Sequence, residues 1–113
     1  MIAHESGEWR TVPLTLWWEV GIAEDKLDIK QSLTIGRRSS CDISLLGDGK
    51  VSRTHCVVAA FEEGWFVVDL ESTGGTTVLG CETDWGPLVP GAQIRVGDTI
   101  LNVIERVELR LAA

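Results

Sequence analysis

Three short stretches of the sequence gather residue types that hold a phosphate group. They read Gly-Arg-Arg-Ser-Ser-Cys-Asp-Ile at residues 36–43, Lys-Val-Ser-Arg-Thr-His at 50–55 and Glu-Ser-Thr-Gly-Gly-Thr at 71–76. A guanidinium group can donate two parallel hydrogen bonds to two phosphate oxygens. Small hydroxyls donate further hydrogen bonds, and glycines let the backbone turn sharply. The stretches therefore predict a site that recognises a phosphate group.

The charge of the whole chain argues against polyanionic partners. The 113 residues carry 10 Lys and Arg against 17 Asp and Glu, a net charge of -7. DNA, RNA and anionic lipid favour a positive protein surface, so we expect no nucleic acid and no membrane as partner. Residues 36–55 differ, because they hold four cationic side chains against two aspartates. Of these cations, we expect Arg38 to face water and Lys50 to be incidental to the local cationic site.

Length and composition predict one folded domain. Hydrophobic residues make up 44% of the chain and charged residues 24%, which is typical of a globular protein rather than a disordered one. We expect residues 1–10 to form a flexible end and residues 11–110 a single domain. No signal-peptide pattern opens the chain, and no apolar run reaches the roughly 18 residues that span a bilayer. These features predict a cytoplasmic protein.

The spacing of apolar and turn residues predicts strands. Apolar and polar residues alternate along several stretches, and no stretch keeps a helical apolar period. Strands are expected at residues 12–20, 27–35, 43–46, 56–61, 65–70, 76–79, 93–96 and 99–109, with a polar turn at 21–26 and a long connection at 80–89. Short strands separated by frequent turns predict an all-β sandwich.

The order of the motifs resembles that of the forkhead-associated (FHA) domain family. The motifs are Gly36-Arg37, Cys41-Asp42-Ile43, Val51-Ser52-Arg53-Thr54-His55, Asp69-Leu70, Ser72-Thr73-Gly74-Gly75-Thr76, Pro90-Gly91 and Val96-Gly97-Asp98. Several motifs in one order, over residues 27–104, are more specific than any one of them. The resemblance implies an FHA-type β-sandwich of about eleven mostly antiparallel strands in two sheets. It also implies binding of phosphothreonine peptides through loops at one end.

The resemblance further implies which residues make the site. The phosphopeptide-binding residues would be Arg37, Ser52, Arg53, Thr73 and Gly74, with structural support from Gly36, His55 and Gly75. In that family the residues matching Arg37 and Ser52 contact the phosphate and the one matching Arg53 commonly assists. Thr73 would lie beside the phosphothreonine, and His55 would brace the binding loops.

Gly74 departs from the family pattern. The family has an asparagine here, which hydrogen-bonds the peptide backbone next to the phosphothreonine. A neutral hydrogen bond contributes about 0.5–1.5 kcal/mol net, and glycine also loosens a loop. We therefore expect peptide binding to be weaker or less selective, with the phosphate half of the site intact.

Catalytic and metal-binding interpretations fit the sequence poorly. His55, Ser72 and Asp69 form a nominal Ser-His-Asp set, but no nucleophile elbow or oxyanion hole accompanies them. The three cysteines lack the spacing of zinc ligands and are expected to be buried thiols; they are Cys41, Cys56 and Cys81. We expect no enzyme activity, no metal and no cofactor.

The predicted function is a phosphothreonine-dependent protein-binding module. Its partner would be a threonine-phosphorylated protein in a Ser/Thr kinase circuit. The alternative is a phosphate-independent scaffold or self-association domain that uses sandwich faces and exposed tryptophans. Trp18 and Trp65 fall on the expected inward face, whereas Trp9, Trp17 and Trp85 are harder to bury.

Overall fold

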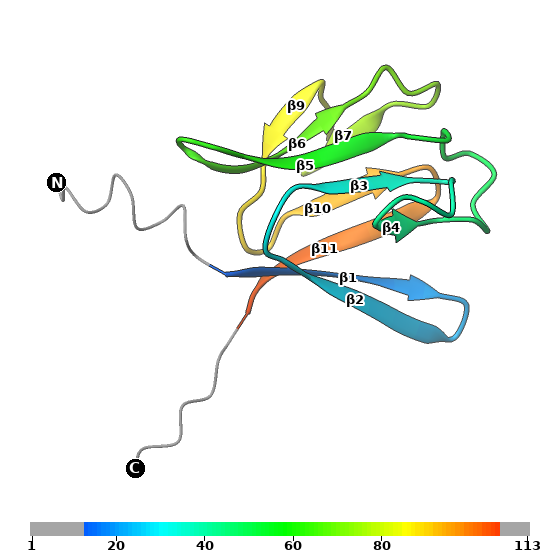
Figure 1. Cartoon of the computed structure of the whole chain (residues 1–113), viewed down its shortest axis with the longest axis horizontal. Coiled ribbons are helices and arrows are strands. Elements are labelled where there is room, and N and C mark those ends of the chain that lie inside the picture. The colour runs from blue at the N-terminus through cyan, green and yellow to red at the C-terminus, as the bar shows by residue number, and fades with distance from the viewer. Residues whose placement is uncertain (1–12, 107–113) are drawn as a thin grey trace, which may run out of the picture.

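The computed structural model describes residues 13–106, which form eleven strands in two sheets and contain no helix (Figure 1). The prediction of an all-β sandwich with about eleven strands is confirmed. Residues 1–10, expected to be flexible, and Trp9 among them, lie outside the described residues, as do 11, 12 and 107–113. Nothing in the described range is a helix long and apolar enough to cross a membrane.

Six strands form one sheet in the order β2-β1-β11-β10-β7-β8, and five form the other in the order β4-β3-β5-β6-β9. The first sheet comprises β1 (Leu14–Val20), β2 (Ala23–Ile29), β7 (Thr76–Val78), β8 (Cys81–Glu82), β10 (Gln93–Val96) and β11 (Thr99–Glu105). The second comprises β3 (Leu33–Gly36), β4 (Ile43–Ser44), β5 (Cys56–Phe61), β6 (Gly64–Asp69) and β9 (Trp85–Pro87). Apart from the parallel pair β3 and β4, the paired strands are antiparallel.

The core lies between the two sheets. Inward and outward side chains alternate clearly on β11, where Leu101 is fully buried while its neighbour Ile100 is exposed. On the second sheet, Val58 and Val67 also point into the core and are fully buried. Because successive side chains of a strand point to opposite faces of the sheet, this burial follows from the alternation of apolar and polar residues in the sequence.

The two tryptophans expected to face inward do so, and the other two described tryptophans differ in exposure. Trp18 is buried, and Trp65 is partly buried and packs against the core. Trp17 is half-buried, whereas Trp85 is 52% exposed. Tryptophan exposure on the described chain is therefore concentrated at β9, on the five-stranded sheet.

The expected polar turn at residues 21–26 is wrong. The turn contains only Gly21 and Ile22, with Gly21 at a φ of 64°, and β2 already begins at Ala23. Residues 23–26 have weak strand propensity, but they pair with residues 17–20 of β1, and β2 as a whole pairs along the full length of β1. Pairing with an adjacent strand outweighs such local preferences.

The expected single strand at residues 27–35 is also wrong, because it is divided between the two sheets. β2 ends at Ile29 and β3 begins at Leu33 in the other sheet. Both side chains are nevertheless buried in the shared core, because the exposed residues 30–32 let the chain cross from sheet to sheet. The inward face was predicted correctly and the crossing was missed.

Two further expectations near the end of the chain need correction. The connection expected at residues 80–89 contains the short strands β8 and β9. Cys81 lies on β8 and is exposed, whereas Cys41 and Cys56 are buried as expected. β8 is an edge strand of only two residues, and both of its side chains are exposed. The expected last strand ends at Glu105.

Candidate functional site

Four connections meet at one end of the sandwich. β3 is antiparallel to β5 and β5 to β6, so the end of β3, the start of β5 and the end of β6 share one end of their sheet. In the other sheet, the end of β10 lies beside the starts of β7 and β11. Residues 37–42, 45–55, 70–75 and 97–98 are thus brought together, at the right of Figure 1.

Gly36 lets the first two of these connections touch. A Cβ atom at Gly36 would collide with the backbone carbonyl of Arg53, so a larger residue would force the loops apart. Arg37 N–H donates to Ser52 O at 3.0 Å, and Arg38 N–H donates to Arg53 O at 3.1 Å. The structure therefore holds Arg37 and Ser52 side by side, as the sequence motifs require.

Three arginines surround a shallow hollow of about 440 Å³. Its lining consists of Arg37, Arg38, Arg53 and Leu46. Arg37 Nε donates to Val51 O at 3.0 Å, which leaves both terminal nitrogens of the guanidinium group to bind an anion. All three arginines are exposed, and within the part of the chain that the structure describes no carboxylate pairs with them. The hollow is thus cationic although the chain is acidic.

Ser52 and Thr73 do not line this hollow, and they provide hydroxyl groups on the second and third connections. Ser52 Oγ accepts a hydrogen bond from Thr73 N–H at 3.1 Å. Because the oxygen acts there as an acceptor, the Ser52 hydroxyl hydrogen remains available to donate elsewhere. Thr73 is exposed, and its hydroxyl has no partner among residues 13–106. Both hydroxyls can therefore donate to the oxygens of an anion.

His55 braces the loops from beneath. Its imidazole is fully buried, Nδ1 accepts from Ser52 N–H at 3.0 Å, and Nε2 lies 2.8 Å from Gly75 O. A backbone N–H can only donate and a carbonyl can only accept, so the ring is the neutral tautomer with its hydrogen on Nε2. One side chain therefore ties the loop carrying Ser52 to the loop carrying Thr73.

Asp69 organises the third connection. Its carboxylate accepts hydrogen bonds from the Ser72 hydroxyl at 2.6 Å, the Thr76 hydroxyl at 2.7 Å and the Ser72 backbone N–H at 3.0 Å. Ser72 Oγ in turn accepts from Gly75 N–H at 2.9 Å. Burial raises the pKa of Asp69, but the hydrogen bonds from Ser72 and Thr76 outweigh burial and hold the pKa below its ordinary value of 3.8.

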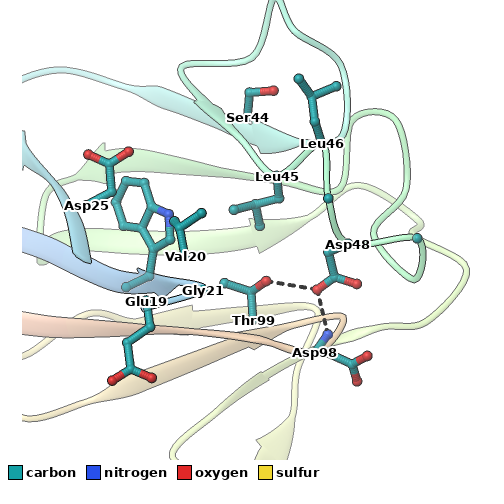
Figure 2. A pocket seen from close by; sticks show the side chains of 13 residues that line it. Glu19, Val20, Gly21, Asp25, Ser44, Leu45, Leu46, Asp48, Asp98 and Thr99 are labelled. Atoms are coloured by element: carbon teal, nitrogen blue, oxygen red, sulfur yellow. Dashed lines mark hydrogen bonds between the residues drawn. The ribbon is translucent and has the colours of Figure 1, made fainter. Parts of the chain in front are cut away.

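Asp48 joins the second connection to the opposite sheet (Figure 2). It accepts hydrogen bonds from Asp98 N–H at 2.7 Å and the Thr99 hydroxyl at 2.8 Å. Burial raises the pKa of Asp48, but hydrogen bonds from Thr99 and from backbone N–H groups, including that of Lys50, lower it overall. Lys50 itself pairs with Asp98 at 3.3 Å and does not line the arginine hollow.

The two glycines of the third connection differ in what they require. Gly75 has a φ of 82°, and a Cβ atom there would lie 2.6 Å from the Glu82 carboxylate, so only glycine is free of strain. Gly74 lacks a positive φ, and a Cβ atom would meet only Lys50 O at 3.6 Å. The backbone at position 74 therefore accommodates an asparagine.

The nominal catalytic set does not form a triad. Asp69 binds Ser72 directly, and both ring nitrogens of His55 are engaged by backbone groups, so the imidazole cannot act as a base toward Ser72. Burial raises the pKa of the Cys56 thiol to about 12, which keeps it protonated. No metal-ligating cluster occurs among the residues that the structure describes.

Sequence reasoning missed two supporting carboxylates and one apolar wall. The sequence patterns give Asp48 no role, place Asp69 only in a motif and a nominal triad, and place Leu46 only in an expected strand. Asp69 was detectable, because it precedes Ser72 by three residues, a spacing that suits a local side-chain to backbone hydrogen bond. Asp48 acts on residues 50 positions away, and no local pattern indicates such a contact.

The FHA domain family model matches residues 33–101. Among solved structures, an FHA domain from a study of phosphothreonine-dependent FHA domain interactions is 28% identical, with a TM-score of 0.75 over 85% of this chain and 99% of that one. The FhaA FHA domain, solved in complex with the intracellular domain of Rv3910, is 30% identical, with a TM-score of 0.71 over 80% and 98%. An FHA domain from Arabidopsis thaliana is 25% identical, with a TM-score of 0.77 over 90% and 92%. No curated protein matches the chain.

Replacing Asp69 by asparagine is expected to destabilise the protein at neutral pH. Asparagine offers one acceptor oxygen in place of two, so either the Ser72 N–H or the Ser72 and Thr76 hydroxyl hydrogens lose their acceptor, and an unsatisfied buried group costs about 1–3 kcal/mol. Because the folded-state pKa of Asp69 is lowered, its stabilisation is complete above pH 3.8 and is lost as the pH falls below that value. Urea unfolding of the wild type and Asp69→Asn should therefore differ at pH 7 and converge in acid.

Asp84→Asn is the matched control for this comparison. Asp84 is exposed, and its side chain has no hydrogen-bond partner among residues 13–106. Its replacement should change the free energy of unfolding by no more than about 0.5 kcal/mol. A difference between wild type and Asp69→Asn that is absent at pH 7, or that persists unchanged in acid, would contradict the role given to Asp69.

Proposed function

This chain belongs to the FHA domain family, and we propose that it is a phosphothreonine-dependent protein-binding module. Membership of this family implies a binding module rather than an enzyme. One similar FHA domain comes from a study of phosphothreonine-dependent FHA domain interactions, and another was solved in complex with the intracellular domain of Rv3910. The proposed partner is a protein phosphorylated on threonine by a Ser/Thr kinase. We propose that this binding takes place in the cytoplasm and that the domain catalyses no reaction.

The observation that carries this proposal is the unneutralised arginine hollow. Arg37, Arg38 and Arg53 lack carboxylate partners in the described range although the chain has a net charge of -7. Like charges brought together without a counter-ion repel one another, so such a cluster gains stability when an anion binds. A phosphate dianion satisfies several guanidinium groups at once.

The proposed contacts assign a distinct task to each side chain. The terminal nitrogens of Arg37 would donate to two phosphate oxygens, since its Nε is already fixed by Val51 O. Ser52 would donate its free hydroxyl hydrogen, and Arg53 would complete the coordination. Thr73 would position the peptide beside the phosphothreonine, while His55 keeps the loops in place without touching the ligand.

Calorimetric titration with phosphothreonine peptides tests the proposal. Arg37→Ala should weaken binding about ten- to hundredfold, because charge-assisted hydrogen bonds contribute about 1.5–3 kcal/mol each. Lys50→Ala is the matched control, because it removes the same charge from a side chain that pairs with Asp98, and it should bind within about twofold of the wild type. Equal affinities for wild type and Arg37→Ala, or equal binding of the unphosphorylated peptide, would refute the proposal.

Gly74→Asn should increase the affinity for the same peptides. The backbone accepts a Cβ atom here, and a new hydrogen bond to the peptide backbone contributes about 0.5–1.5 kcal/mol, which is about two- to tenfold in the dissociation constant. Gly74→Ala is the control, since it adds the Cβ atom without the amide and should bind no tighter than the wild type. A gain that alanine reproduces, or no gain with asparagine, would exclude a role for this position in holding the peptide.

One observation favours a second, phosphate-independent function. The outward side of β5, β6 and β9 carries only apolar side chains in matched rows; they are Val57, Ala59, Phe61, Phe66, Val68, Trp85 and Pro87. Three of their rings contact one another in edge-to-face or tilted pairs, with centroids 4.5–5.3 Å apart. An antiparallel sheet normally shows polar residues to solvent, so this face suits self-association or scaffolding.

Sedimentation analysis over a range of protein concentrations tests this second function. Self-association through the apolar face requires that wild type and Arg37→Ala dimerise alike and that Trp85→Ser remains monomeric. Trp85 is suitable because it is half-exposed on an edge strand, so its loss disturbs the core little. A wild type that stays monomeric at every concentration would rule out self-association through this face.

A further inference from the structure

A second hollow of about 500 Å³ lies beside the arginine hollow, between the β1–β2 hairpin and the β4–β5 loop (Figure 2). Figure 2 shows Asp25 and Val20 on the hairpin side and Leu45, Leu46 and Asp48 on the loop side. Val20 is 56% exposed and Leu46 is 65% exposed. The hollow therefore has apolar walls that are open to solvent, together with carboxylates.

Leu46 is shared by the two hollows. It lines the arginine hollow on one side and this second hollow on the other. An extended peptide advances about 3.3 Å per residue, so a chain anchored by its phosphothreonine passes from one hollow to the other within a few residues. A side chain close to the phosphothreonine therefore reaches the second hollow.

Asp25 and Glu19 are carboxylates that line this hollow and pair with no cation among residues 13–106. Figure 2 shows the Glu19 side chain directed away from Leu45 and Asp48, whereas Asp25 lies beside Val20. Asp25 pairs across the hairpin with Trp18, so the two side chains lie on the same face of the sheet. Asp25 accepts a hydrogen bond only from the backbone N–H of Lys26, at 3.0 Å, and no cation pairs with it among residues 13–106. By contrast, Asp48 accepts several hydrogen bonds and Asp98 pairs with Lys50.

An indole ring adds to the chemistry of this hollow. Trp18 lines the hollow together with Asp25, and an indole ring attracts a cation. Ser44 also lines it, but its Oγ is almost wholly buried, so a ligand in the hollow does not reach that hydroxyl. Asp25 and the Trp18 ring thus have the chemistry to bind a positively charged group.

We infer that this second hollow binds a lysine or arginine side chain of the phosphopeptide, with Asp25 as its carboxylate partner. Such a side chain combines an aliphatic stem with a cationic end, which matches the exposed Val20 and Leu46 walls and the unpaired Asp25. The inference rests on the proposed phosphopeptide function and specifies it further. The partner would carry a basic residue a few positions from its phosphothreonine, so that phosphate and cation occupy adjoining hollows of opposite charge.

Fluorescence anisotropy with a positional peptide set tests this inference. Each peptide contains one phosphothreonine and either lysine or glutamine at a single flanking position, with every position on both sides sampled. At one or two positions the wild type should bind the lysine peptide about two- to fivefold more tightly, which is typical of a solvent-accessible ion pair. Asp25→Asn should remove that preference.

Glu24→Gln is the matched control, because it also removes one negative charge from β2. Glu24 pairs with Glu19, so it lies on the opposite face from Asp25, and it does not line the hollow. This variant should keep the preference for lysine. Loss of the preference in both variants would assign it to overall charge and overturn the inference.

The inference and the function on which it rests fail in different ways. Phosphate-dependent binding with equal affinities for lysine and glutamine at every position refutes only the basic-residue hollow, as does a lysine preference that survives in Asp25→Asn. Absence of phosphate-dependent binding by any peptide refutes both. Circular dichroism of each variant confirms that a lost preference does not come from unfolding.

Discussion

The site depends on one buried imidazole. His55 is fully buried; its Nδ1 accepts a hydrogen bond from the backbone N–H of Ser52, and its Nε2 donates one to Gly75 O. Those two backbone groups belong to different connections, so a single ring sets the distance between the loop that carries Ser52 and Arg53 and the loop that carries Thr73. Asp48 and Asp69 act in the same way on neighbouring segments. Polar side chains held by several hydrogen bonds thus give irregular loops a defined geometry.

This support explains how an acidic protein maintains a cationic site. Arg37, Arg38 and Arg53 repel one another, and loops free to move would separate them. The backbone bonds from Arg37 and Arg38 to the second connection prevent that separation, and the close approach at Gly36 makes those bonds attainable. The free energy needed to hold like charges together comes from the folded scaffold, and an anion that enters the hollow releases the repulsion.

The sequence predicted those features that depend on local pattern. Alternation of apolar residues identified the sandwich and the inward side chains, and the glycine, arginine, serine and histidine motifs identified residues that the fold does bring together. It failed where the pairing of strands decides rather than local residue preference, as in the start of β2 at Ala23 and the crossing after Ile29. It also missed the contact of Asp48 with Thr99 and the outward apolar face around Phe66, because both join segments that are distant along the chain.

The most direct test of the central claim is a crystal structure of the protein bound to a phosphothreonine peptide. The account predicts phosphate oxygens within hydrogen-bond distance of the Arg37 guanidinium group and of Ser52 Oγ, with Arg53 beside them and the His55 contacts unchanged. A phosphate bound away from Arg37 and Ser52, or a peptide seated on the Phe61, Phe66 and Trp85 face instead, would contradict it.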